Sequence, residues 1–275
     1  MNVLRKSIGS IAANIITIFM SLIILIPIIV LFLNSFKNKG ESNTMSLSLP
    51  KKWIFENYKT VIEQGKLVSS FFNSLLYATC SVVIIVFVVA AAAFVIARNR
   101  SGINNFIYYF IISGIAIPIN NVALMKVLQA LNLVNTRIGI ILVYAAINIP
   151  LSLFLSYGFI STIPREIDEA AIIDGCGPVK LFIKIILPLL KPIISTLFVL
   201  NFMAVWNDFM MPLYYLNNSG KWPMTLAVYN FFGAFENSWN LVSADIILTL
   251  LPVLVVFILG QKYIIGGVAA GSVKG

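Results

Sequence analysis

The sequence predicts an all-α fold, a polytopic membrane helical bundle with about six transmembrane helices. The first observation is composition, because 60% of the 275 residues are hydrophobic and only 11% are charged. Soluble domains carry about a quarter charged residues, and a single core of this size would not bury so much apolar surface. The second observation is that the charged residues are confined to short intervals between long uncharged runs.

Those runs define the expected helices in order. Four of them lack Asp, Glu, Lys and Arg and exceed the roughly 20 residues that cross a bilayer as a helix; they are 7–36, 67–97, 101–125 and 138–164. Two shorter runs, 192–207 and 246–261, reach spanning length when flanking turns are added. The connections expected outside the membrane include 37–66, 126–137 and 217–245.

The first run reads as an anchor helix rather than a cleavable signal peptide. Arg5 and Lys6 resemble the basic start of a signal peptide, but the uncharged run is too long and no small-x-small site follows it. We therefore divide the chain into 1–66, an N-terminal anchor helix with the first external loop, and 67–275, the main membrane domain.

Charge alone decides the orientation only weakly. With the N-terminus inside and six spans, ten of the 19 basic residues lie on the inner side and nine on the outer side. Four of the five arginines fall inside, which favours a cytoplasmic N-terminus. The basic residues are scattered at helix ends rather than gathered in a patch, so a nucleic-acid-binding role is rejected.

The loop 163–187 has the most specific pattern in the chain. Pro164 and the acidic residues after it suit the start of a helix, Gly175 and Gly177 suit a break, and Pro178 suits the start of a second helix. Two helices this short are marginal in water alone, so they need a surface to pack against. From the residues alone, an amphipathic loop resting on the membrane and a loop that docks on a partner are about equally supported.

The chemistry that the sequence lacks narrows the function. There is no histidine, and Cys80 and Cys176 are far apart, which excludes a zinc site of the usual Cys/His kind. The Gly-Lys pairs at 65–66 and 220–221 are not part of a phosphate-binding P-loop. We expect no enzyme activity, no metal and no cofactor in this chain.

The loop resembles the EAA loop of ABC importer permeases. The matching positions are Glu169, Ala170, Ala171, Asp174, Gly175, Ile185, Leu187 and Pro188, while Cys176 stands where a small residue such as alanine is usual. This gapped, multi-position match implies a type I ABC importer permease fold with the loop in the cytoplasm. The residues it marks for coupling to an ATPase are Glu169, Ala170, Ala171, Asp174, Gly175, Phe182, Leu187 and Pro188.

More of the chain is similar to the MalG-type branch of that family, which carries oligosaccharides, glycerol phosphate and similar solutes. The segments that carry the likeness are 34–37, Trp53, 56–58, 72–75, 117–118, 131–136, 206–209, 212–213 and the C-terminal residues 261–263, Gly266, Gly271 and 274–275. The resemblance implies a permease subunit of an ATP-driven sugar importer in the cytoplasmic membrane, with both termini in the cytoplasm. It implies as partners a second related permease, two ATPase subunits that bind ATP, and an extracytoplasmic solute-binding protein.

Alternatives remain at this stage. A permease for another solute such as a glycerol phosphate is the nearest. An ion-coupled secondary transporter is disfavoured because the four long runs hold no ionisable relay groups of the kind such proteins use. A membrane scaffold is disfavoured by the EAA-like loop.

Polar residues inside the spans suggest a solute pathway. Such side chains are costly in lipid unless they face protein or water, and the candidates are Tyr144, Asn148, Asn201, Trp206 and Asn207. For any single Asn, a hydrogen bond between helices is the simpler explanation, worth about 0.6 kcal/mol in one measured membrane protein.

Overall fold

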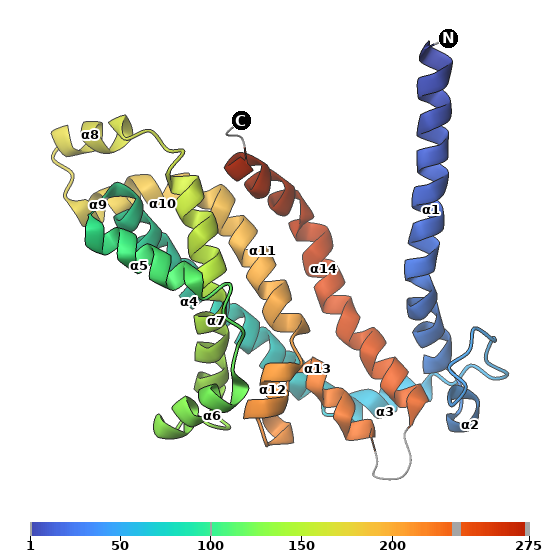
Figure 1. The fold of residues 1–275 in the computed structure, drawn as a ribbon. Helices are drawn as coiled ribbons and strands as arrows, with labels where there is room; N and C mark the ends of the chain where they lie inside the picture. The colour runs from blue at the N-terminus through green and yellow to red at the C-terminus, as the bar shows by residue number, and fades with distance from the viewer. Residues whose placement is uncertain (1, 100, 233–237, 273–275) are drawn as a thin grey trace. The chain divides into compact units, whose positions relative to one another are not determined.

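A computed structural model describes residues 2–99, 101–232 and 238–272, and within them the chain is helical with no β-strand (Figure 1). Two compact units are present. The first comprises the residues up to Leu67 together with Ala227–Leu250, and the second comprises Val68–Leu226 together with the chain from Leu251 onward. The sequence-based division into 1–66 and 67–275 stays a prediction.

Four described helices are long and apolar enough to cross a membrane: α1 (Asn2–Ser35, apolar from Ile16), α4 (Leu67–Arg98), α7 (Arg137–Ile160) and α14 (Trp239–Ser272). A fifth span is possible if the segment Pro178–Leu189 and helix α11 (Lys191–Asn207) are taken as one element bent by 71°. The described residues therefore give four or five spans, where the sequence predicted about six.

The expected third span, 101–125, is broken into two helices. Helix α5 covers Gly102–Ser113, and α6 covers Asn121–Ala130. Pro118 has no backbone N–H and disfavours a helical conformation at the residue before it. Asn120 then caps α6, its side-chain oxygen accepting from the backbone N–H groups of Val122 and Ala123 at 3.1 and 3.0 Å. The capped start of α6 ends the continuous run that charge counting had suggested.

Two expected loops are also shorter than predicted. Residues 126–130, taken as part of the second external loop, lie in α6. Helix α12 (Met210–Tyr215) directly precedes the third expected loop, 217–245. The loop itself contains three short helices, η2 (Ser219–Lys221), α13 (Met224–Ala227) and η3 (Val228–Phe231). It ends early, because α14 starts at Trp239 rather than after residue 245. Residues 233–237, 274 and 275 of the expected segments lie outside the described residues.

The first unit is built around the C-terminal end of α1. Helices α2 (Lys39–Ser42) and α3 (Glu56–Gln64) follow it, and the start of α14 joins them. The buried Asn57 of α3 accepts a hydrogen bond from the Asn240 side chain of α14 at 3.0 Å. An amide pair at this position satisfies two polar groups that burial would otherwise penalise.

The second unit has one apolar core that extends into the loop 163–187. Helix α7 packs against α5 and α11. The core is formed by α4 residues such as Ile85, Val89 and Ala93 together with loop residues Leu181 and Ile186. The loop is thus part of the helical core rather than an appendage, and its geometry is fixed by the same packing as the spans.

Candidate functional site

The loop 163–187 forms two short helices joined by a tight turn, as the sequence predicted. Helix α8 covers Glu166–Ile173 and α9 covers Pro178–Leu181; one π-helical turn, η1 (Phe182–Ile186), then leads into α10 (Leu187–Leu189) and α11. Figure 1 shows α8 and α9 side by side at one end of the second unit. We refer to residues 163–190 as the coupling segment.

Gly175 makes the turn between α8 and α9. Its φ of +79° is in the left-handed region, where L-residues with a Cβ are strained. The turn is closed by backbone hydrogen bonds from Gly175 to Ile172 (3.0 Å) and from Cys176 to Ala171 (2.9 Å), the pattern that ends many helices. A Cβ at Gly175 would meet no atom within 4 Å, so the constraint on this residue is its backbone angle and not space.

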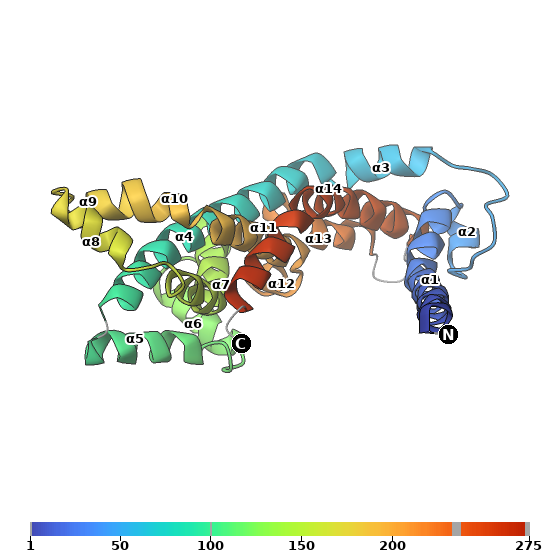
Figure 2. The ribbon, with the colours of Figure 1, turned by 90° about the horizontal axis from the view of Figure 1, so that it is seen from above.

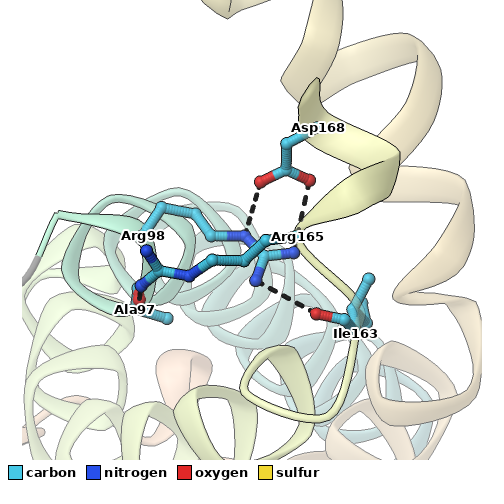
Figure 3. A network of polar contacts seen from close by, with 5 residues as sticks. All are labelled: Ala97, Arg98, Ile163, Arg165 and Asp168. Atoms are coloured by element: carbon cyan, nitrogen blue, oxygen red, sulfur yellow. Dashed lines mark hydrogen bonds and ion pairs between the residues drawn. The ribbon is translucent and has the colours of Figure 1, made fainter. Parts of the chain in front are cut away.

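An ion pair fastens α8 to the end of α4. Arg98 Nε lies 2.6 Å from Asp168 Oδ2, and both side chains are largely buried at 14% and 12% exposure. Arg98 also donates to Asp168 Oδ1 at 3.2 Å and to the Ile163 carbonyl at 3.1 Å (Figure 3). One guanidinium therefore holds both the entry of the coupling segment and its first helix, a fixed fork geometry that a lysine would not reproduce.

A second arginine crosses between the same two elements in the opposite direction. Arg165 donates to the carbonyl of Ala97 at 3.4 Å (Figure 3). The carbonyls near the end of α4 lack partners within the helix, so Arg165 supplies a donor where one is needed. The two arginines together tie α4 and α8 by side-chain contacts to both backbone and carboxylate.

The π-helical turn changes which residues of the segment are buried. Regular α-helical spacing would place Val179, Phe182, Ile183 and Ile186 on one face. In the structure Leu181 and Ile186 are buried and Val179 and Ile183 are exposed. Residues five apart share a face across a π-helical turn, which explains why Leu181 and Ile186 point into the core together.

The residues marked for coupling fall into two groups. Glu169, Ala170, Asp174, Gly175 and Pro188 are exposed, while Ala171 is buried and Phe182 and Leu187 are half-buried. The buried group packs on the core, with the Phe182 ring 5.5 Å from that of Phe94. The residues Phe182, Leu187 and Pro188 also line an apolar groove of about 330 Å³ against α4.

The outer side of the coupling segment is apolar. Ile173 is 85% exposed and Val179 is 69% exposed, on either side of the Gly175 turn, and Ile172 is 61% exposed. Scattered exposed apolar residues are ordinary, but several that meet at the tip of one rigid element suggest a docking surface. The segment is therefore anchored to the core on one side and exposes apolar side chains on the other.

The predicted pathway residues make structural contacts. The Tyr144 hydroxyl donates to Asp208 Oδ2 at 3.0 Å, and the Asn148 amide donates to the Tyr144 carbonyl one turn earlier. The buried Asn201 amide donates to Ser152 Oγ of α7 at 3.1 Å. This is a hydrogen bond between helices, of the kind expected as the simpler explanation.

The two remaining pathway candidates differ from each other. Trp206 is buried and stacks on Phe202 with ring centroids 5.5 Å apart, whereas Asn207 is exposed. The structure thus brings Tyr144 and Asn148 together and places Asn201 in a separate contact.

Comparisons with known proteins identify the family of the chain. Residues 66–268 match the family described as "Binding-protein-dependent transport system inner membrane component". The chain belongs to this family of permeases. It is 34% identical to the "Probable starch degradation products transport system permease protein AmyC" of Thermoanaerobacterium thermosulfurigenes, over 94% of each chain. It is also 34% identical to the "Melibiose/raffinose/stachyose import permease protein MelC" of Bacillus subtilis, over 91% of each.

A solved structure supports the fold. The permease is similar to a chain in the crystal structure of a bacterial ABC transporter involved in the import of the acidic polysaccharide alginate. The TM-score is 0.80, with 23% identity, over 94% of this chain and 96% of that one. The all-α polytopic prediction and the type I permease fold are confirmed, and the protein is a multi-pass component of the cytoplasmic membrane.

Sequence reasoning missed the partners of Asp168 and Asp208. Asp168 was assigned to the positive end of α8, yet it pairs with Arg98, which lies 70 residues earlier in the chain. Asp208 belongs to the segment 206–209 that carries the family likeness, and it accepts from both Tyr144 and the backbone of Met211. A single sequence carries no signal for either pairing.

Replacing Asp168 with asparagine should loosen the coupling segment. The change leaves Arg98 without its charged partner and should cost about 2 kcal/mol, or roughly 30-fold in local opening. Limited proteolysis of the purified permease within 163–190 should accelerate correspondingly. Glu169→Gln is the matched control, because Glu169 is exposed on the same helix. Equal cleavage rates for the two variants would show that the ion pair does not hold the segment.

Proposed function

We propose that this permease is the membrane subunit of an ATP-driven ABC importer that carries a sugar or oligosaccharide into the cell. The observation that carries the proposal is the coupling segment, which is fixed to the helical core by Arg98 and ends in an exposed apolar tip around Gly175. The names of the relatives support the solute class, since AmyC and MelC are named for starch products and for melibiose, raffinose and stachyose. A third relative, 31% identical, is named for diacetylchitobiose uptake.

Coupling in this proposal is mechanical. ATPase subunits bind the exposed face of α8 and α9, and their closure moves the segment as one piece. The movement passes to α4 through Arg98 and Asp168, and to α11 through the continuous chain at η1 and α10. Because packed interfaces shift between discrete arrangements rather than deform continuously, displacement of the segment would switch the spans between outward-open and inward-open states.

The proposal assigns the remaining parts to other chains. ATP is bound and hydrolysed by two ATPase subunits, a second related permease completes the pathway, and an extracytoplasmic binding protein delivers the solute. The coupling segment lies in the cytoplasm, with both chain termini on that side. These partners are those that the family implies for its members.

A solute pathway past α7 and α11 also belongs to the proposal. Tyr144 contacts Asp208, Asn148 lies one turn after Tyr144 on α7, and Trp206 and Asn207 directly precede Asp208 in the chain. These residues supply aromatic faces and hydrogen-bonding groups of the kind that bind sugars. Asn201 is held by Ser152 and by the Leu197 carbonyl. We assign Asn201 a packing role first and a solute role second.

Alanine substitution separates these roles. Asn207→Ala should change the KM for oligosaccharide uptake several-fold with normal assembly, because the side chain is exposed. Asn201→Ala should lower the yield of assembled permease, because it leaves Ser152 without its amide partner. Uptake in proteoliposomes and co-purification with the partner permease measure the two effects. If alanine at Tyr144, Asn148, Asn201 and Asn207 leaves uptake kinetics unchanged, the partner permease supplies the contacts.

Gly175→Val should uncouple the transporter while leaving it assembled. Left-handed backbone costs a residue with a Cβ about 1–2 kcal/mol, so the α8–α9 turn should reorganise. The matched control is Gly177→Ala, since Gly177 has an ordinary φ of −71° and equally open surroundings. Solute uptake and ATP hydrolysis are measured together in proteoliposomes. Normal uptake by Gly175→Val would remove the segment from the coupling mechanism.

The orientation is tested through Cys176, which lies beside the turn and is partly exposed. A membrane-impermeant maleimide should label Cys176 in inside-out vesicles that lack the ATPase, and should not label it in intact cells. A Cys176→Ser variant, which keeps Cys80, gives the background. Labelling of Cys176 from outside intact cells would place the coupling segment on the wrong side for an importer.

A further inference from the structure

A cluster of exposed apolar side chains lies in the connection between α1 and α4. We call residues 47–62 the interface segment; its exposed apolar residues, with exposed fractions, are Leu47 (53%), Leu49 (72%), Trp53 (45%), Phe55 (68%) and Ile62 (41%). Trp and Tyr are enriched where proteins meet the headgroup layer of a membrane, and Lys and Arg beside a span also act as interfacial anchors. The segment also carries Tyr58 and exposed lysines at 51, 52 and 59.

The interface segment is held beside the C-terminal end of α1. Phe36 directly follows the last residue of α1, and its ring centroid lies 5.0–5.2 Å from those of Trp53, Phe55 and Tyr58. The backbone N–H of Ile54 donates to the Phe36 carbonyl at 2.9 Å. The aromatic residues of the segment therefore sit level with the end of the span.

Polar contacts make this attachment rigid. The Asn57 amide donates to the carbonyls of Ser35 and Lys37 at 2.8 and 2.9 Å, which satisfies carbonyls that the end of α1 leaves open. Tyr58 and Ser35 share a hydrogen bond of 2.7 Å between their hydroxyls. Burial raises the pKa of the Tyr58 hydroxyl above its usual value, so it remains a neutral partner at any physiological pH.

Lys37 fixes the early part of the segment as well. Its buried ammonium donates to the Ser46 carbonyl at 2.8 Å and to the hydroxyls of Ser46 and Ser48 at 3.3 Å. A buried ammonium is tolerated when its donors are satisfied. Leu47 and Leu49, on either side of Ser48, are thereby kept beside the end of α1 with their side chains exposed.

Helix α3 lies across the direction of α1. In Figure 1 α1 runs vertically and α3 runs horizontally below it, and in Figure 2, seen along that vertical, α1 is close to end-on while α3 lies in the plane of the view. If α1 crosses the bilayer, α3 runs along its surface. Amphipathic helices in this orientation bury one face in the headgroup and acyl boundary.

The exposed surface of α3 has two sides of different chemistry. Helical spacing places Phe55, Lys59 and Ile62 along one side, and Glu56 and Glu63 along the neighbouring side. The buried residues Asn57 and Val61 occupy the side toward the rest of the unit. The Lys59 ammonium lies 3.4 Å from the Glu56 carboxylate, so its charge is directed toward the acidic side. The side with Phe55 and Ile62 therefore suits lipid, and the charged side suits water.

We infer that the interface segment is a membrane anchor whose apolar side chains, Leu49, Phe55 and Ile62 above all, insert into the headgroup layer of the leaflet in which α1 ends. The depth set by Phe36 and the orientation of α3 both favour lipid over a soluble partner as the occupant. The inference rests on α1 as a membrane span. It requires neither the proposed solute nor the proposed orientation of the transporter.

The anchor would hold the end of α1 at a fixed depth. Within the first unit, the contacts of α1 described above lie at its C-terminal end, at Ser35 and Phe36. Interfacial aromatic and basic residues help to set the tilt and rotation of a span. The interface segment supplies these residues through its contacts with Phe36.

Site-directed spin labelling tests the anchor. Single cysteines replace Phe55 or Ile62, and Glu63 is the matched control one residue away, all with Cys80→Ser and Cys176→Ser in the permease pair reconstituted in anionic phospholipid nanodiscs. Collisions with molecular oxygen, which concentrates in lipid, are compared with collisions with an aqueous nickel chelate. The oxygen-to-nickel ratio should be several-fold higher at positions 55 and 62 than at 63.

Equal, water-like ratios at positions 55, 62 and 63 would overturn the anchor. Shielding of 55 and 62 from both reagents only after a binding protein is added would also overturn it, because it would identify that protein as the occupant. The measurement uses neither ATP nor solute. Failure of the anchor therefore leaves the proposed transport function standing, and loss of transport activity leaves the anchor standing.

Discussion

The contact on which the coupling segment depends is the ion pair between Arg98 and Asp168. Removing two charges from water is expensive, so a largely buried pair is weak evidence for stability by itself. Its value here is positional, because the guanidinium also binds the Ile163 carbonyl and thus fixes where the chain leaves α7. With that point set, α8 has one orientation, and the Gly175 turn determines the direction of α9. Without it, α8 would keep the hydrogen bond from Arg165 to α4 and the packing of Ala171, but would lose the contact that fixes its carboxylate face.

The ends of helices impose the second constraint. Backbone groups at helix ends need partners, and those near the bilayer core cannot rely on water. Asn57 serves the end of α1, Arg165 serves the end of α4, and Asp208 accepts from the backbone at the start of α12. Two of the predicted pathway residues are also used within the helices, because the amides of Asn148 and Asn201 donate to the carbonyls of Tyr144 and Leu197. This is why Asn207, which is exposed, is a better pathway candidate than Asn201, whose amide is already used.

Much of the architecture was predictable because helices that cross a bilayer must be long and almost free of charged residues. The uncharged runs located α1, α4, α7 and α14, and the glycine and proline positions located α8, the turn and α9. The run 101–125 was misread because hydrophobicity does not reveal that Asn120 starts a new helix. The π-helical turn at Phe182–Ile186 was also invisible, since it changes the helical period without changing composition. The pairing of Arg98 with Asp168 needed knowledge of the fold, because one sequence contains no record of which distant residues meet.

Rigidity and exposure are combined in one element. A segment that transmits force must hold its own shape, and Leu181, Ile186 and Ala171 provide this by packing in the same core as the α4 helix. It must also keep apolar side chains exposed, because their burial against a partner is what would stabilise the complex. Ile173 and Val179 are such side chains. The two requirements conflict in a short loop, where burying more residues would remove the docking surface. The π-helical turn reconciles them, since a regular α-helix would place residue 185 rather than Ile186 near the face of Leu181. By shifting the period by one residue, it turns Leu181 and Ile186 inward together and leaves Val179 and Ile183 facing out.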